Sequence, residues 1–126
     1  MIKVSAYYPY TDGVRFDFDY YTSSHIPLCQ SRLGCSRVEV SKGISDANPN
    51  DPPLYVATAD LYFETVDAVH EGFKAHGREL FADLPNYTDC KPQFIILLSF
   101  KYLLEIKRSK LFFSNISKLF WISLGS

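Results

Sequence analysis

The segment Leu54–Phe63 constrains the fold of this 126-residue chain more than any other stretch. Its side chains alternate with a period of two, which is typical of a β-strand with two distinct faces. One face is apolar, and the other carries Val56, Thr58, Asp60 and Tyr62. A carboxylate on a central strand is costly unless it is paired or hydrated, so we expect the second face to line a cavity.

The second face of this strand also bears on assembly. An exposed sheet face is the simpler alternative, but it would leave Tyr7, Val56 and Tyr62 in water. Covering that face with the sheet of a second copy removes the difficulty. The pattern therefore favours a homodimer.

Hydrophobic periodicity and turn residues predict six elements within residues 1–100. Strands are expected at residues 2–8, 37–43, 54–63 and 91–100, and helices at residues 17–34 and 65–84. The order β-α-β-β-α-β is that of a ferredoxin-like α+β fold, with two helices on one face of an antiparallel sheet. Residues 1–100 are thus expected to form one domain.

The first predicted helix gathers acids, phenols and an imidazole. Asp17 is a good N-cap, because its carboxylate can accept hydrogen bonds from the first free N–H groups. Tyr21 and His25 are four residues apart, which places them side by side on one helix face. Pro27 lacks an N–H and clashes with the preceding turn, so the helix should bend or restart just after His25. His25 would then reach a cavity from that break.

Two motifs resemble a known family. One is Phe-Asp-x-Asp-Tyr-Tyr-x-x-x-His-x-Pro-Leu over residues 16–28, and the other runs from Phe73 and His76 through Glu79 and Asp83 to Pro85-Asn86-Tyr87-Thr88. Together they resemble the EthD-like family over residues 1 to about 99. The resemblance implies a ferredoxin-like fold that pairs into a dimeric α+β barrel. It also implies a loose association with oxidoreductases and with ether degradation.

The wider superfamily of that family includes lactone isomerases, polyketide cyclases or dehydratases, and heme-handling monooxygenases. Membership therefore narrows the fold more than the reaction.

Composition and motifs exclude several classes of function. The net charge of −1 gives no general attraction to nucleic acid. An odd number of cysteines without C-x-x-C spacing, and no signal peptide, indicate a cytoplasmic protein. Because the sequence shows no phosphate-binding glycine loop, nucleophile elbow or histidine pair at metal spacing, we predict no cofactor and no metal. We expect the thiols to be buried or idle. The alternative concerns Cys29, which follows His25 by one turn, where an imidazolium would stabilise a thiolate.

The remaining chemistry is proton transfer in a pocket for a hydrophobic small molecule. We assign His25 as the acid/base, Tyr21 and Tyr87 as hydrogen-bond donors, and Asp60 as the group that orients the imidazole or acts as a second carboxylate. The predicted substrate-binding residues are Tyr7, Tyr62, His76 and Tyr87.

A structural alternative exists for His25, Tyr21 and His76. His25 would then bond a carbonyl at the break before Pro27, and Tyr21 would fill the core. His76 would pair with Glu79 or interact with the helix dipole near the end of the second helix.

Three functions follow from these observations. The first is an enzyme acting on an aromatic, ether or polyketide-like metabolite, an oxidoreductase by family association. The second is a cofactor-free isomerase, cyclase or dehydratase that uses His25, and it fits the residues better. The third is a ligand-binding or accessory protein without turnover, and heme handling is a minor fourth. We favour an enzyme.

The last 26 residues differ from the rest. Residues 101–126 hold five of the 13 Lys and Arg residues and one of the 14 acids, so their charge is +4 against −5 for residues 1–100. One interpretation is a basic amphipathic helix that docks on a membrane or on the partner subunit. We favour a misread gene end, because the composition changes abruptly. Leu111–Leu124 is too short and too charged to span a bilayer.

Overall fold

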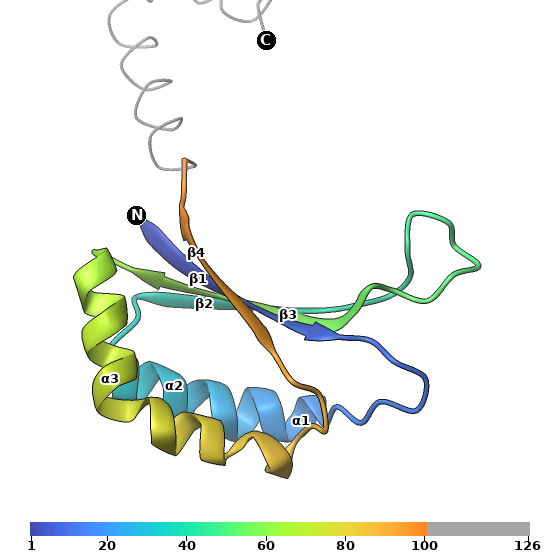
Figure 1. The fold of residues 1–126 in the computed structure, drawn as a ribbon, viewed down its shortest axis with the longest axis horizontal. Coiled ribbons are helices and arrows are strands. Elements are labelled where there is room, and N and C mark those ends of the chain that lie inside the picture. The colour runs from blue at the N-terminus through green and yellow to red at the C-terminus, as the bar shows by residue number, and fades with distance from the viewer. Residues whose placement is uncertain (101–126) are drawn as a thin grey trace, which may run out of the picture.

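A computed structural model describes residues 1–100, which form a four-stranded antiparallel sheet with helices on one face (Figure 1). The strands are β1 (Ile2–Pro9), β2 (Arg37–Lys42), β3 (Tyr55–Phe63) and β4 (Gln93–Leu98), in the spatial order β2-β3-β1-β4. The helices are α1 (Phe18–Tyr20), the π-helix η1 (Tyr21–His25), α2 (Ile26–Leu33), α3 (Val66–Ala82) and the 3₁₀-helix η2 (Leu84–Asn86). The predicted ferredoxin-like order is confirmed.

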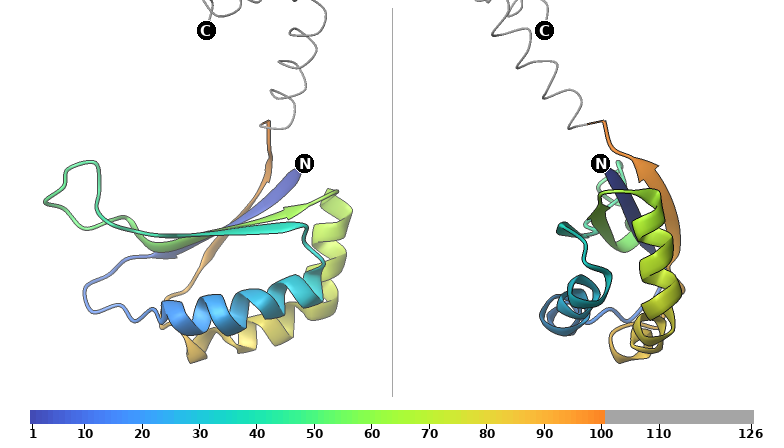
Figure 2. Two further views of the ribbon diagram at one scale, coloured as in Figure 1. Left: turned by 180° about the vertical axis from the view of Figure 1, so that it is seen from behind. Right: turned by 90° about the vertical axis from the view of Figure 1, so that its left-hand side faces the viewer.

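Two helical segments cover the same side of the sheet. The continuous run α1–η1–α2 lies beside α3, and the opposite sheet face has no helix of residues 1–100 over it (Figures 1 and 2). Asp17 accepts a hydrogen bond from the Tyr20 N–H, so the predicted N-cap is confirmed, and Thr65 caps α3 in the same way by accepting from the Ala68 N–H. Gly34 ends the first segment with a φ of 66°, a left-handed conformation that glycine adopts without strain.

The first helical segment widens into a π-turn just before Pro27. The hydroxyls of Thr22 and Ser23 donate to the carbonyls of Phe18 and Asp19, which competes with the regular helical ladder. The wide turn ends at His25 and α-helix restarts at Ile26, as predicted from the missing N–H of Pro27. π-turns of this kind are frequent at functional sites.

The alternation along the strands separates two environments. Val4, Ala6 and Tyr8 of β1 and Ala57 and Ala59 of β3 are almost completely buried under the helices. Their neighbours in sequence point to the other side, where Ser5 is paired with Asp60 across the strands. The core therefore lies between the sheet and the helices.

No helix within residues 1–100 combines the length and apolar character needed to cross a membrane. The interpretations of residues 101–126 lie outside the described residues.

Candidate active site

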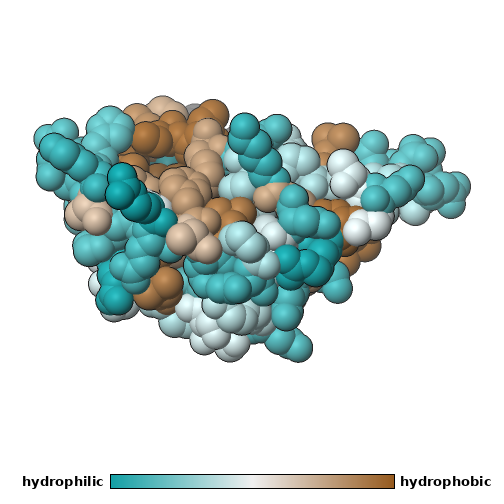
Figure 3. Space-filling view, turned by 60° about the horizontal axis from the view of Figure 1, so that its bottom comes forward, coloured by the Kyte–Doolittle hydropathy of each residue, from teal (hydrophilic) through white to brown (hydrophobic). Residues whose placement is uncertain are grey.

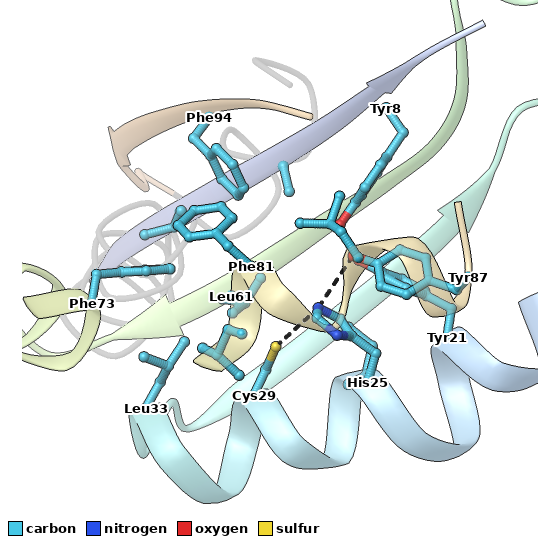
Figure 4. Close-up of a pocket in the computed structure, with 15 residues that line it drawn as sticks. Tyr8, Tyr21, His25, Cys29, Leu33, Leu61, Phe73, Phe81, Tyr87 and Phe94 are labelled. Atoms are coloured by element: carbon cyan, nitrogen blue, oxygen red, sulfur yellow. Dashed lines mark hydrogen bonds between the residues drawn. The ribbon is translucent and has the colours of Figure 1, made fainter. Parts of the chain in front are cut away.

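A small cavity of about 30 Å³ lies between the sheet and the helices. One end of its lining is polar, with Tyr8, Tyr21, His25 and Tyr87, and the other is aromatic and apolar, with Phe73, Phe81 and Phe94 (Figure 4). These side chains come from β1, η1, α3, β4 and the segment after η2. The cavity thus joins titratable groups to an apolar compartment.

His25 is paired with a carboxylate. Its Nδ1 lies 2.8 Å from Asp83 Oδ2, at the end of α3. The other oxygen of Asp83 accepts hydrogen bonds from the Tyr20 hydroxyl at 2.6 Å and from the Asn86 amide at 2.8 Å. Burial by itself would raise the pKa of Asp83, but the hydrogen bonds from Tyr20, Asn86 and His25 outweigh it and lower the pKa. Asp83 is therefore a carboxylate that accepts from His25.

The second nitrogen of His25 faces the cavity. Nε2 lies 3.3 Å from the Tyr87 hydroxyl and 3.5 Å from Cys29 Sγ (Figure 4). Since Asp83 accepts from Nδ1–H, we assign the tautomer in which Nε2 carries the free lone pair. Burial lowers the pKa of His25, although Asp83 partly opposes this effect. The imidazole is thus a neutral base directed at the cavity.

Three tyrosines surround this base. The hydroxyls of Tyr8 and Tyr87 are 2.8 Å apart, and the ring of Tyr21 stacks on His25 with centroids 5.4 Å apart. The confirmed contact between Tyr21 and His25 follows from their spacing on the helix. Burial raises the pKa of all three hydroxyls, so they remain protonated hydrogen-bond donors.

Cys29 is a buried thiol, as expected. Burial raises the pKa of its thiol to about 12. Because burial also lowers the pKa of His25, an imidazolium beside Cys29 is disfavoured as well. The alternative of a stabilised thiolate is therefore contradicted, and the expectation of an idle thiol at Cys29 holds.

The structure divides the predicted site residues between two faces of the sheet. His25, Tyr21 and Tyr87 come together at the cavity. Asp60 lies on the opposite face, where it accepts from the Ser5 hydroxyl and lies 3.9 Å from Lys3 Nζ. The prediction that Asp60 orients His25 is wrong, because successive residues of β3 alternate sides and the helices cover only the side of Ala59.

The other predicted substrate-binding residues also lie away from the cavity. Tyr7 contacts Tyr55, and Tyr62 lies under the Arg37 guanidinium at 4.3 Å, both on the face that carries Asp60. His76 is half-buried on α3 and is not among the residues lining the cavity. Its suggested partner Glu79 accepts from Arg32 of α2 at 3.0 Å.

The assignment of roles from sequence missed Asp83 and Tyr8. Asp83 stands in the second motif that carries the family resemblance, and this was the available signal. Tyr8 alternates with Tyr7 along β1 and therefore shares its face with Val4 and Ala6, and this alternation in the sequence was the available signal. Among the described residues, no group of three or more His, Cys, Asp and Glu side chains is arranged to hold a metal ion.

Comparison with known proteins finds relatives over most of the described residues. The chain is 37% identical to an EthD-like protein of Ralstonia eutropha JMP134, with a TM-score of 0.74, covering 76% of this chain and 88% of that protein. It is 32% identical over 89 residues to an uncharacterized 11.0 kDa protein of Rhodococcus erythropolis from the thcB-thcC intergenic region, covering 69% of this chain and 84% of the relative.

A more distant structure agrees in fold. The ethyl tert-butyl ether D (EthD) family protein of Bacillus halodurans C-125 has a TM-score of 0.57 at 18% identity, covering 79% of this chain and 98% of that protein. No family model matches the chain.

Proposed function

Because this chain belongs to the EthD-like family, we propose that it binds a neutral, hydrophobic small molecule beside His25 and transfers a proton within it. One observation carries the proposal: a carboxylate, an imidazole and a phenol, Asp83–His25–Tyr87, are linked in a chain whose inner end faces an apolar cavity. This arrangement supplies a general base and a hydrogen-bond donor next to each other.

The geometry suits proton abstraction beside a carbonyl group. Nε2 of His25 would take a proton from the carbon next to the carbonyl; the C–H electron pair would form a C=C bond, and the π electrons of the C=O bond would move to the oxygen to give an enolate. The Tyr87 hydroxyl would donate a hydrogen bond to that oxygen, and the imidazolium would be stabilised by Asp83 through Nδ1–H. Return of the proton from the imidazolium to another carbon completes an isomerisation; its transfer to a β-hydroxyl, which leaves as water while the enolate electrons form the new C=C bond, completes a dehydration.

The family association with oxidoreductases concerns a different reaction class. A redox reaction requires an electron carrier, and the cavity residues would then supply the proton transfers that accompany it. The proton chemistry of Asp83, His25 and Tyr87 is common to both classes.

The test uses a neutral ketone with exchangeable protons. We expect the purified chain to accelerate exchange of the α-protons of 2-tetralone with solvent deuterium, measured by mass spectrometry. His25→Gln should abolish the acceleration, and Tyr87→Phe should reduce it about 100-fold, as for loss of one oxyanion donor. His70→Gln, on the exposed side of α3, is the matched control and should keep the parent rate.

Binding without turnover is the second candidate. It is favoured by the fact that, within residues 1–100, every buried side-chain nitrogen and oxygen already has a hydrogen-bond partner. 2-Naphthol, a planar analogue of the enol of 2-tetralone, distinguishes the two candidates. Saturable binding of 2-naphthol without exchange of the α-protons of 2-tetralone would support a binding protein without turnover. Proton exchange that persists in His25→Gln would contradict the assignment of His25 as the base.

We also propose that the chain forms a homodimer through the sheet face without helices. Ile95 of β4 is 46% exposed there, next to half-buried Tyr7 and Leu97. These apolar side chains on β1 and β4 are stabilised when a second sheet covers them. Light scattering after size-exclusion chromatography should give a dimer mass for the parent chain and a monomer mass for Ile95→Lys.

A further inference from the structure

The cavity beside His25 is too small for an aromatic ligand as it stands. Its volume is about 30 Å³, whereas an engineered apolar cavity that accepts benzene measures about 150 Å³. Any ligand of the proposed class therefore requires lining side chains to move. The lining residues differ greatly in how freely they can do so.

The polar end of the cavity is held in place. Tyr87 and Tyr21 are 0% and 1% exposed, and both pack their rings against His25. Moving either ring would break contacts on all sides. The polar end is therefore a fixed recognition surface.

The apolar end is closed by two side chains that reach solvent. Phe81, at the end of α3, and Phe94, on the edge strand β4, are each 45% exposed. Their rings meet edge to face, with centroids 5.5 Å apart and an interplanar angle of 85°. Figure 4 places them at the end of the cavity away from His25. Because each of these residues is nearly half exposed, rotation about its side-chain bonds breaks few contacts.

The surface around these rings is apolar as well. Ile96 and Leu98 follow Phe94 on the same face of β4 and are 41% and 55% exposed. Figure 3 shows hydrophobic residues gathered in a patch on an otherwise largely hydrophilic side of the molecule. Within the described part of the chain, no Lys, Arg, Asp or Glu lines the cavity.

From these observations, we propose that Phe81 and Phe94 form an aromatic gate, and that it selects neutral, flat, apolar molecules with a single hydroxyl or carbonyl group. Such a ligand enters between α3 and β4 with its polar group leading. That group reaches the hydroxyl of Tyr87 and Nε2 of His25, while the ring body takes the space vacated by Phe81 and Phe94. The identity of the ligand class rests on the proposed function; the position of the entrance does not.

Stopped-flow fluorescence with 2-naphthol tests the gate in the full chain. Phe81→Ala and Phe94→Ala should each raise the association rate constant about tenfold, because binding that requires a conformational change is slowed by it. Leu98→Ala is the matched control: it removes a more exposed side chain from the same face of β4, away from the cavity. Its rate constant should equal that of the parent chain.

Substitution by leucine separates gating from a general loosening of the fold. Phe81→Leu keeps an apolar side chain of intermediate size and should give an intermediate rate constant, with a urea midpoint close to that of the parent. Parent-like rate constants in folded Phe81→Ala and Phe94→Ala would overturn the gate. An equal rise in Leu98→Ala, or no binding of 2-naphthol to any of these proteins, would overturn it as well.

The nitrogen signals of the His25 ring distinguish the gate from the proposed function. If 2-naphthol enters faster in the phenylalanine variants but leaves the ¹⁵N shifts of His25 unchanged, the gate stands and the proposed role of His25 fails. If the shifts of His25 respond but entry is insensitive to both phenylalanines, the proposed function stands and the gate fails.

Discussion

The two sides of the sheet carry the same residue types in different surroundings. On the helix side, Tyr87 and Asp83 are tied to His25 in a nearly closed space. On the opposite side, the ring of Tyr62 lies under the Arg37 guanidinium, and the partly exposed Asp60 lies 3.9 Å from Lys3 Nζ. Both sides contain a phenol and a carboxylate, but only on the helix side do these groups meet an imidazole at a cavity. Residue identity alone therefore does not make a site.

The largest expected contrast is in packing. Tyr21→Ala should lower the free energy of unfolding by roughly 3–5 kcal/mol, because the ring is 1% exposed and leaves a cavity in the core. Tyr7→Ala, on the half-buried outer face, should cost about 1 kcal/mol. Urea unfolding followed by circular dichroism measures both. Equal losses would mean that the outer face is as tightly packed as the core.

The next contrast compares the two carboxylates. Asp83→Asn should lower the free energy of unfolding by about 2 kcal/mol, since it removes a charged acceptor from a buried imidazole. It should also lower the pKa of His25 further, because the hydrogen bond and charge of Asp83 raise it. Asp60→Asn should cost less than about 1 kcal/mol, as its ion pair with Lys3 is partly exposed. NMR titration of His25 would show whether Asp83 acts on it as stated; an unchanged pKa in Asp83→Asn would contradict the pairing.

The pH dependence of stability gives a smaller effect with a defined sign. Burial lowers the pKa of His25 in the folded chain, so as the pH falls, His25 is protonated in the unfolded chain before it is protonated in the folded chain. The contribution of His25 is complete above its unfolded pKa of about 6.5 and is lost as the pH falls from there toward the folded pKa, by up to about 1.4 kcal/mol per pH unit. Asp83, whose pKa is also lowered, contributes above about pH 3.9 and loses its contribution as the pH falls through its folded pKa.

Two variants test whether His25 causes the change in unfolding free energy just below a pH of about 6.5. His25→Gln should flatten the slope of unfolding free energy just below pH 6.5. His70→Gln, at an exposed position, should keep the parent slope. A slope that persists in His25→Gln would have to be assigned to another group.

The sequence predicted the fold because its signals are local. The alternation of β3, the N-cap at Asp17 and the break before Pro27 each depend on a few neighbouring residues, and all three are found in the structure. The spacing of Tyr21 and His25 predicted their contact for the same reason.

The pairing of His25 with Asp83 could not be predicted from local sequence signals. The two residues are 58 positions apart, and they meet only because the end of α3 lies against η1. Parity, however, already argued against Asp60: the helices were expected on the side of Ala57 and Ala59, so a helical histidine and the side chain of Asp60 face opposite sides of the sheet. The assignment of Asp60 to the site of His25 was wrong because it placed residues from opposite faces of the sheet in one pocket.

The smallest expected effect on the single chain concerns Asp60 and its neighbours. Lys3→Ala removes an ammonium group 3.9 Å from Asp60 and should change the free energy of unfolding by less than about 0.5 kcal/mol, as for an exposed ion pair. Burial of this face against a second copy would strengthen the pair, because water no longer screens it. Unfolding should therefore be measured at two protein concentrations, with Ile95→Lys as the monomeric reference. If Lys3→Ala costs well above about 0.5 kcal/mol in the parent background but not in Ile95→Lys, Lys3 and Asp60 lie inside a dimer. If the loss is equally small in both backgrounds, this face is exposed to solvent, unlike the cavity of His25.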